Sequence, residues 1–112
     1  MKKLLWLLFF TSSNVFATNV DSDGPKDIVN LFFYSKEDTT YSGWQGVVQL
    51  EMASLTWSAS TTCSTRYVLI RSTDEHMLSV ALTARTANKP LRIYVDDTKR
   101  IDNFCFARAL GY

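Results

Sequence analysis

The stretch TTYSGWQG, residues 39–46, gathers side chains that could hold a sugar without any catalysis. Tyr41 and Trp44 supply aromatic faces, and Ser42 and Gln45 supply a hydroxyl and an amide. A pyranose ring has apolar C–H faces and polar edges, so one aromatic plane beside a few hydrogen-bonding groups is enough to orient it. The structural alternative is that Trp44 packs in the domain or at a subunit contact while Tyr41 covers the loop. The sequence leaves both alternatives open.

A second pair with binding chemistry lies in the predicted strand LRIYV, residues 91–95. Strand alternation places Arg92 and Tyr94 on one face, opposite the apolar positions of the same segment. Together they could hold a carboxylate, such as that of a sialic acid, through a charge-assisted hydrogen bond. The alternative is a pair at a subunit interface or one that faces solvent.

The sequence offers no catalytic constellation, so we expect neither an enzyme nor a cofactor. His76 is the only histidine, it has no Ser or Cys partner in a recognisable motif, and two cysteines alone cannot complete a metal site. Asp96 and Asp97 are adjacent, so their carboxylates would not face each other across a sugar as glycoside hydrolysis requires. No nucleophile elbow or Gly-rich phosphate loop is present.

The first 17 residues predict a signal peptide. Lys2 and Lys3 precede an apolar stretch at residues 4–10, and the residues up to Ala17 suit cleavage after that position. The apolar stretch is well short of the ~20 residues that a spanning helix needs, so we expect no membrane span. Export by the Sec route to the periplasm, and from there to the outside, is the expected path.

The charge balance argues against a nucleic-acid partner. The chain has 12 basic and 11 acidic residues, and loss of Lys2 and Lys3 with the leader leaves 10 basic against 11 acidic. Proteins that hold a phosphate backbone present a basic face, which this balance does not favour. The remaining chain, residues 18–112, is long enough for one domain.

Cys63 and Cys105 are the only cysteines. In an exported chain an even pair predicts a disulfide. The alternative is two separate buried thiols. A bond between them would close a loop of about 41 residues and contribute ~4 kcal/mol of stability on the chain-entropy estimate.

Strand-like segments dominate the chain after the leader. A polar N-terminal arm, which we place at residues 18–40, contains the apolar run 28–34 and could supply an edge strand. Period-two alternation and short turns then predict strands at 44–52, 55–61, 65–72, 91–95 and 104–112.

One helix of about 15 residues is predicted in STDEHMLSVALTARTANKP. Ser72 and Glu75 have the spacing of a capping box, and Asn88 and Pro90 are stop signals. An apolar stripe runs along it at Met77, Leu78, Ala81, Leu82 and Ala84.

The element order after the arm is three strands, a helix and two strands. This is the order of the OB-fold, a five-stranded Greek-key barrel with a helix between strands three and four. We therefore expect a mainly β domain of this kind at residues 41–112.

The segment EHMLSVALTARTANKPLRIYV resembles the B, or binding, subunits of AB5 toxins of the pertussis toxin and subtilase cytotoxin types. The segment SGWQGVV, residues 42–48, is similar to the start of strand one in the subtilase-type subunit, and the whole resemblance spans about residues 41–112. The residues that carry it are Met77, Leu78, Ala81, Pro90, Leu91, Arg92, Ile93 and Tyr94.

The resemblance implies a secreted virulence protein without catalysis of its own. Such a subunit forms a homo-oligomer, a pentamer-like ring, that binds host glycans, sialylated ones among them, and delivers a separate catalytic A subunit. The subtilase-type subunit contacts its sugar through a serine that aligns with Ser42 or with Gln45, depending on a gap. Its sugar-contacting tyrosine aligns with Val95, one residue from Tyr94, and a one-residue step reverses the face of a strand.

A different class of function is also compatible with the sequence. A small secreted or periplasmic OB-fold protein could bind another protein, or inhibit an enzyme, without any toxin partner. The fold does not decide between the two, because unrelated functions share the same fold.

Overall fold

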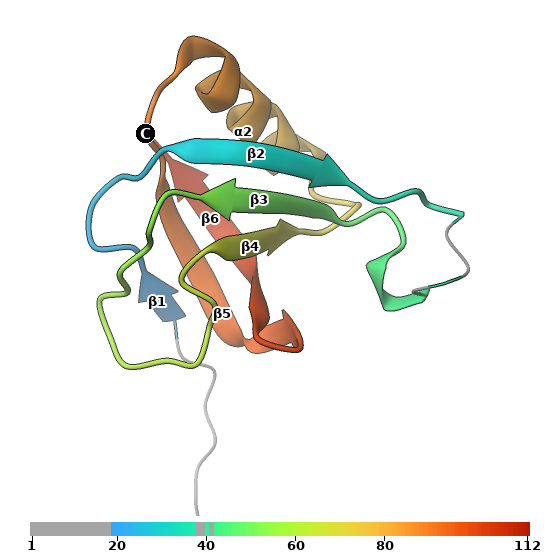
Figure 1. The fold of residues 1–112 in the computed structure, drawn as a ribbon, viewed down its shortest axis with the longest axis horizontal. Coiled ribbons are helices and arrows are strands. Elements are labelled where there is room, and N and C mark those ends of the chain that lie inside the picture. The colour runs from blue at the N-terminus through green and yellow to red at the C-terminus, as the bar shows by residue number, and fades with distance from the viewer. Residues whose placement is uncertain (1–18, 38–39, 41) are drawn as a thin grey trace, which may run out of the picture.

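The computed structural model of this chain describes residues 19–37, 40 and 42–112, which form one sheet and one α-helix (Figure 1). The predicted signal peptide, residues 1–17, lies outside the described residues. The strands are β1 (Asn19–Asp21), β2 (Ile28–Phe33), β3 (Val48–Met52), β4 (Tyr67–Ile70), β5 (Arg92–Ile101) and β6 (Phe104–Gly111). The helix α2 (Glu75–Ala87) lies between β4 and β5, and a short 3₁₀ turn, η2 (Ser42–Trp44), precedes β3.

The six strands form a single mixed sheet in the order β1-β5-β6-β4-β3-β2. Every neighbouring pair is antiparallel except β4 and β6, which are parallel, with Val68 beside Cys105 and Leu69 beside Phe106. The parallel pair is possible because α2 and β5 lie between these strands in the sequence and return the chain in the same direction. A mainly β fold with one helix is therefore confirmed.

The main core lies between the sheet and α2. The predicted apolar stripe of the helix is buried at Met77, Ala81 and Ala84, whereas Leu78 is partly buried and Leu82 is exposed. The strands supply most of the large, fully buried side chains of the core, namely Val20, Leu50, Met52, Val68, Ile70, Ile93, Val95 and Cys105. Because strands alternate, these positions fix which face of each strand points toward the helix.

The strand predicted at residues 55–61 is wrong. This segment is a loop between β3 and β4, and it lies beside β1, where Asp23 N donates to Thr56 O (2.7 Å) and Ser58 N donates to Asp21 O (2.8 Å). The apolar and polar residues of this segment alternate because two side chains anchor the loop. Leu55 is buried in the core, and Trp57 is partly buried against it. The strand that pairs with β3 on its other side is β2, which lies within the arm predicted as a possible edge strand.

Three boundaries also differ from the predictions. The strand predicted from residue 44 begins at Val48, because residues 42–44 form the 3₁₀ turn. The helix has Asp74 as its N-cap and no side-chain cap hydrogen bond, so the capping box at Ser72 is wrong. Asn88 ends the helix as predicted, and the structure shows that it does so in a left-handed conformation. The strand predicted at residues 91–95 is longer than expected, since β5 continues to Ile101.

The predicted disulfide between Cys63 and Cys105 is confirmed. It joins the loop before β4 to β6, two parts of the chain that are 42 residues apart in sequence. Both cysteines are buried in the core cluster, so the bond pins the loop directly onto the sheet.

Replacing both cysteines, Cys63→Ala with Cys105→Ala, should lower the free energy of unfolding by ~4 kcal/mol, because the unfolded chain is no longer cross-linked. Urea denaturation of the variant and the wild type would measure the difference. The wild type under reducing conditions serves as the control and should lose a similar amount. A loss below ~1 kcal/mol in both would contradict the estimate.

Candidate functional site

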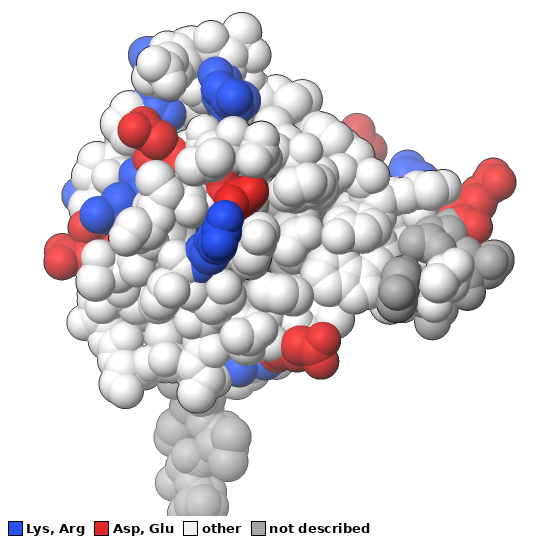
Figure 2. Space-filling model, in the orientation of Figure 1, with Lys and Arg blue, Asp and Glu red and all other residues white. Residues whose placement is uncertain are grey.

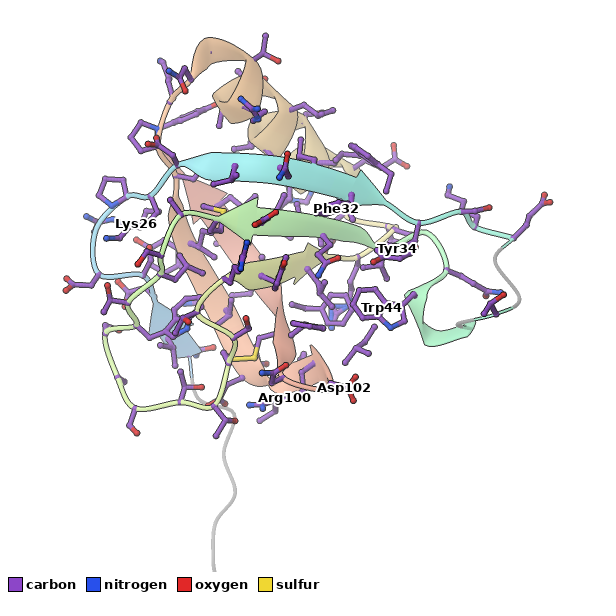
Figure 3. All side chains as sticks on the ribbon, viewed as in Figure 1. Lys26, Phe32, Tyr34, Trp44, Arg100 and Asp102 are labelled. Atoms are coloured by element: carbon purple, nitrogen blue, oxygen red, sulfur yellow. A yellow bond between two sulfur atoms is a disulfide. The ribbon has the colours of Figure 1, made fainter. Side chains whose placement is uncertain are left out.

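Four aromatic side chains contact one another in a chain, and we call them the aromatic surface: Tyr34, Trp44, Tyr67 and Phe104. The ring centroid of Trp44 lies 4.9 Å from that of Tyr34 and 5.7 Å from that of Phe104. The centroids of Phe104 and Tyr67 are 5.5 Å apart. Tilted and edge-on contacts of this kind suit the quadrupoles of the rings. In Figure 3, Trp44 extends from its turn back toward Tyr34 and the strands.

The aromatic surface lies on the face of the sheet opposite α2. Tyr67 and Phe104 directly precede the core residues Val68 and Cys105, so alternation directs them to the other face. Leu69 also points to this face; it is 0% exposed, and it does not belong to the core against the helix. An apolar side chain can be buried on this face only where other side chains cover it.

Backbone hydrogen bonds hold Trp44 in place over this face. Tyr34 N donates to Val47 O (3.0 Å), and Val47 N donates to Trp44 O (3.0 Å). Gly46 N donates to Ser35 O (3.2 Å), which brings the two ends of the β2–β3 connection together. The connection therefore folds back on itself and returns the Trp44 ring to Tyr34.

Polar groups lie beside the rings, and each has a partner. Tyr34 OH donates to Gln49 Oε1 (3.1 Å), and Asn30 Nδ2 donates to Glu51 Oε1 (3.0 Å). Arg66 donates from Nε (2.9 Å) and Nη2 (2.6 Å) to Glu51 Oε2, which is a bidentate pair. The hydrogen bond from Asn30, followed by that from Arg66, lowers the pKa of Glu51, and the Glu51 bond raises the pKa of Arg66.

The arrangement suits a ligand with apolar faces and polar edges. The four rings are partly buried, so each is held in position but keeps some exposed area. Arg66 also lies over the ring of Tyr67, 5.5 Å from its centroid, and extends the surface with a cation. In Figure 2 charged side chains lie around this side of the molecule, and the area to the right of the adjacent blue and red side chains at its middle is mostly uncharged. Uncharged rings with amide, hydroxyl and guanidinium groups at their rim are the chemistry of saccharide binding.

Of the predicted sugar-binding residues before β3, the structure places Trp44 in the aromatic surface. Ser42 begins the 3₁₀ turn that ends at Trp44, and Gln45 follows it as an exposed residue. Tyr41 lies outside the described residues. The turn thus brings Trp44 to Tyr34, a residue that the sequence did not indicate.

Arg92 and Tyr94 do not join this group. Trp44 contacts Phe104, which pairs with Ile101 at the far end of β5, whereas Arg92 is the first residue of that strand. Nine residues of strand correspond to about 30 Å at the usual rise. Arg92 is exposed and Tyr94 is partly buried, so this pair belongs to a different part of the sheet.

Sequence reasoning missed Tyr34, Tyr67 and Phe104. Tyr34 directly follows β2, and the other two residues begin β4 and β6. In the sequence each is an ordinary member of an apolar run. The one available signal was alternation, which sets Tyr67 and Phe104 one position before core residues, but only the sheet order makes these strands neighbours.

The described part of the chain shows neither grouped metal ligands nor a helix suited to a membrane. In that part of the chain, no three His, Cys, Asp or Glu side chains are grouped so that they could hold a metal ion. None of its helices combines the length and apolar character that crossing a membrane requires. No protein-family model matches the chain, and no curated protein or solved structure shows significant similarity to it.

Gly46 should be the glycine on which the position of Trp44 depends. Its φ is +70°, and an added Cβ would lie 2.7 Å from the Cβ of Ser72. We expect Gly46→Ala to lower the free energy of unfolding by ~1–3 kcal/mol through backbone strain and overlap. Gly43→Ala is the matched control, because nothing lies within 4 Å of its added Cβ, and its stability should change by less than ~0.5 kcal/mol. Thermal unfolding would measure both, and equal effects would contradict the prediction.

Proposed function

We propose that this protein is an exported, non-catalytic binding subunit that assembles into a ring and holds host-cell glycans on the aromatic surface. In this proposal it resembles the B subunit of an AB5 toxin, and the ring carries a separate catalytic subunit. The observation that carries the proposal is the contact of Trp44 with Tyr34 and Phe104 beside hydrogen-bonding side chains. Aromatic planes with a polar rim bind sugars through their C–H faces and hydroxyl edges.

The order of the elements supports an OB-like barrel as the scaffold of this subunit. The chain runs through β2, β3 and β4, then α2, then β5 and β6. β4 pairs with β6, strands three and five when the count starts at β2, which gives the order β5-β6-β4-β3-β2 within the sheet. This order is compatible with the proposed scaffold. β1 is then an addition at the edge of β5.

The edge strand β2 supports the proposed assembly. The opposite edge of the sheet, at β1, is covered by the loop that contains Thr56 and Ser58. Tyr34, directly after β2, donates its N–H to Val47 O, directly before β3 (3.0 Å). The alternation of an antiparallel ladder then turns the backbone groups of Leu31 and Phe33 outward. An open edge of this kind is a template for another strand.

Apolar side chains gather at the same edge. Five large apolar side chains are exposed among the described residues, and three of them are on β2: Val29 (41%), Phe32 (43%) and Phe33 (57%). Phe33 also lines a concavity of about 500 Å³ together with Leu78 and Leu82 of α2. A monomer would leave this apolar strip in water, whereas a neighbouring subunit would bury it.

The open edge also favours a second candidate function. A small exported protein could use β2 to bind an extended segment of another protein, whose backbone would add to the sheet. This candidate needs neither a ring nor a toxin partner, and the oligomeric state separates it from the first.

Trp44→Ala should weaken glycan binding about tenfold, because the loss of a stacked ring removes ~1–1.5 kcal/mol. Binding would be screened on a glycan array and quantified by calorimetry with the best oligosaccharide. Tyr112→Ala is the control, since Tyr112 is an exposed aromatic residue (63%) outside the aromatic surface. The sugar-binding proposal would be wrong if no glycan binds the wild type, or if both variants bind equally well while Trp44→Ala keeps its stability.

The wild type should be an oligomer at micromolar concentration, and Phe33→Lys should be a monomer of similar thermal stability. The lysine places a charge in the apolar strip at the open edge but replaces a side chain that is already 57% exposed. Native mass spectrometry and sedimentation would measure the assembly. Ala59→Lys adds the same charge on the exposed β3–β4 loop and should leave the oligomer intact.

A stable monomer of the wild type would overturn the ring and favour the second candidate. Deletion of residues 18–38 is not a suitable test, because that segment contains the buried core residues Val20 and Ile28. Point substitutions on the exposed side of β2 separate assembly from folding.

A further inference from the structure

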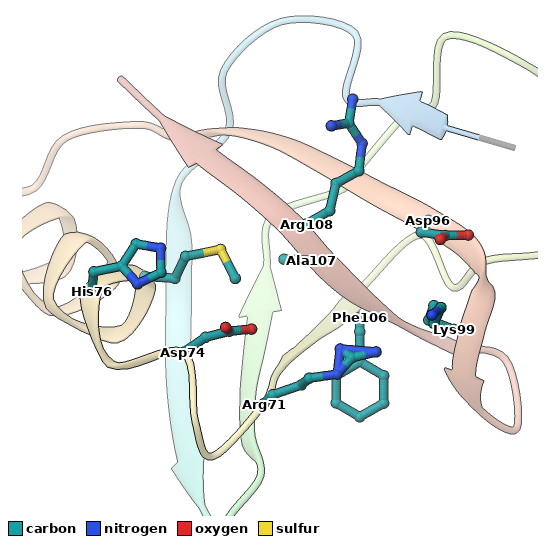
Figure 4. A pocket seen from close by; sticks show the side chains of 9 residues that line it. Arg71, Asp74, His76, Asp96, Lys99, Phe106, Ala107 and Arg108 are labelled. Atoms are coloured by element: carbon teal, nitrogen blue, oxygen red, sulfur yellow. The ribbon is translucent and has the colours of Figure 1, made fainter. Parts of the chain in front are cut away.

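A second concavity, separate from the aromatic surface, lies where α2 begins beside β6 (Figure 4). Its volume is about 420 Å³. Asp74 and His76 lie on the helix side, Asp96 and Lys99 lie on the β5 side, and β6 crosses between them. We call it the α2–β6 pocket, and its charged residues are Arg71, Asp74, Asp96, Lys99 and Arg108.

Arg71 is held in this pocket by an aromatic ring. Its guanidinium carbon lies 4.6 Å from the centroid of Phe106, and Figure 4 shows the group over that ring. A guanidinium that stacks on a ring through its face keeps its N–H donors in the plane of the group, pointing outward at its edge. Arg71 is therefore positioned without using the donors that bind a carboxylate or a sulfate.

A bulge in β5 positions the other wall. The pairing with β6 jumps from Asp96 to Arg100, so the intervening residues leave the ladder. Asp96 Oδ1 accepts hydrogen bonds from Thr98 N (3.0 Å) and Thr98 Oγ1 (2.6 Å), which fixes the bulge and brings Lys99 to the pocket. These bonds from Thr98, followed by the charges of Lys99 and Arg108, lower the pKa of Asp96, so its carboxylate is ionised near neutral pH.

The three cations of the pocket lack a close salt-bridge partner in the part of the chain that the structure describes. Among the residues that the structure describes, the side chains of Arg71, Lys99 and Arg108 make no hydrogen bond or ion pair. By contrast, Arg66 is paired with a carboxylate, and Arg100 donates to a carbonyl and a hydroxyl. Arg108 lies over Tyr94, 5.8 Å from its centroid, and in Figure 4 it extends away from Arg71. Arg71 and Lys99 are thus the two cations left for a ligand.

We propose that the α2–β6 pocket binds a saccharide residue that bears one acidic group, with Arg71 and Lys99 on the acid and the Asp74 and Asp96 carboxylates accepting from its hydroxyls. The pocket carries three positive and two negative side chains, an arrangement that suits a ligand with one anionic group and several O–H donors. The two carboxylates would repel a polyanion. The Asp74 side chain is free for this role because it makes no cap hydrogen bond with α2.

The inference rests on the proposed glycan binding but assigns it a second site, with a different ligand class from that of the aromatic surface. Its test therefore uses single sugars that differ in charge. Glucuronate, glucose 6-sulfate and glucose would be titrated into the isotope-labelled protein while amide and arginine Nε signals are followed by NMR. Glucuronate or glucose 6-sulfate should shift the signals of Arg71, Lys99 and Phe106, and glucose should not. The tighter of the two acids identifies the acidic group.

Arg71→Gln should raise the Kd of the acidic sugar about tenfold or more, because it removes a charge-assisted hydrogen bond. Arg85→Gln is the matched control: it removes the same charge from the exposed last turn of α2 and should leave the Kd unchanged. Lys99→Gln should also weaken binding, and it carries the test if Arg71→Gln does not fold. Trp44→Ala should have no effect on the acidic sugar.

Four results would overturn the inference. If Arg85→Gln weakens binding of the acidic sugar as much as Arg71→Gln does, the effect comes from net charge alone. If glucose binds as tightly as glucuronate, the acidic group has no role in binding. Equally tight binding of inorganic sulfate would mark a general anion site and not a saccharide site. The fourth result is that neutral oligosaccharides bind in a Trp44-dependent way while no acidic sugar binds at Arg71. It would leave the proposed function intact and refute this site alone.

Discussion

A single helix can cover only one face of a six-stranded sheet, and this constraint decides how the rest of the chain is used. α2 covers the face that carries Val68 and Ile70. On the other face Leu69 is fully buried, and its cross-strand neighbours are Gln49 and Phe106. The cover on that side is built from loops and strand ends, because the chain has no second helix among its described residues. The cluster of aromatic rings is therefore first a structural requirement of the sheet.

The same requirement explains why the aromatic surface is a good candidate for binding. Cover provided by rings at strand ends leaves part of each ring in water, whereas a second helix would have hidden the sheet completely. Beside the rings lie two polar side chains, Gln49 (8% exposed) and Glu51 (7% exposed), each bonded to a partner. A buried polar group without a partner is costly, so these bonds hold the side chains in fixed positions. Fixed rings and fixed polar groups are pre-organised for a ligand, which lowers the entropic cost of binding.

The two edges of the sheet also differ: one is covered within the chain, and the other is open to another molecule. The β1 edge is closed by backbone bonds to the loop at Thr56 and Ser58, which uses its donors and acceptors within the chain. Among the described residues no strand pairs with the outer edge of β2, which displays Val29, Phe32 and Phe33. The open backbone and the apolar side chains of β2 thus both favour contact with another strand. The α2–β6 pocket, by contrast, lies near the middle of the sheet order.

Local patterns in the sequence predicted the helix with its buried residues Met77, Ala81 and Ala84, its end at Asn88, most of the strands and the disulfide of the two cysteines. They misassigned residues 55–61, where alternation came from loop anchors and not from a ladder. Only the tertiary structure decided which aromatic residues meet, because Tyr34, Tyr67 and Phe104 come from three strands whose order depends on a parallel pairing between β4 and β6. It also decided that Arg71 and Lys99 share a pocket, since a bulge in β5 brings the latter toward β6. Periodicity fixes the face on which a residue lies, but the neighbours on that face come from long-range pairing, which has no local signal.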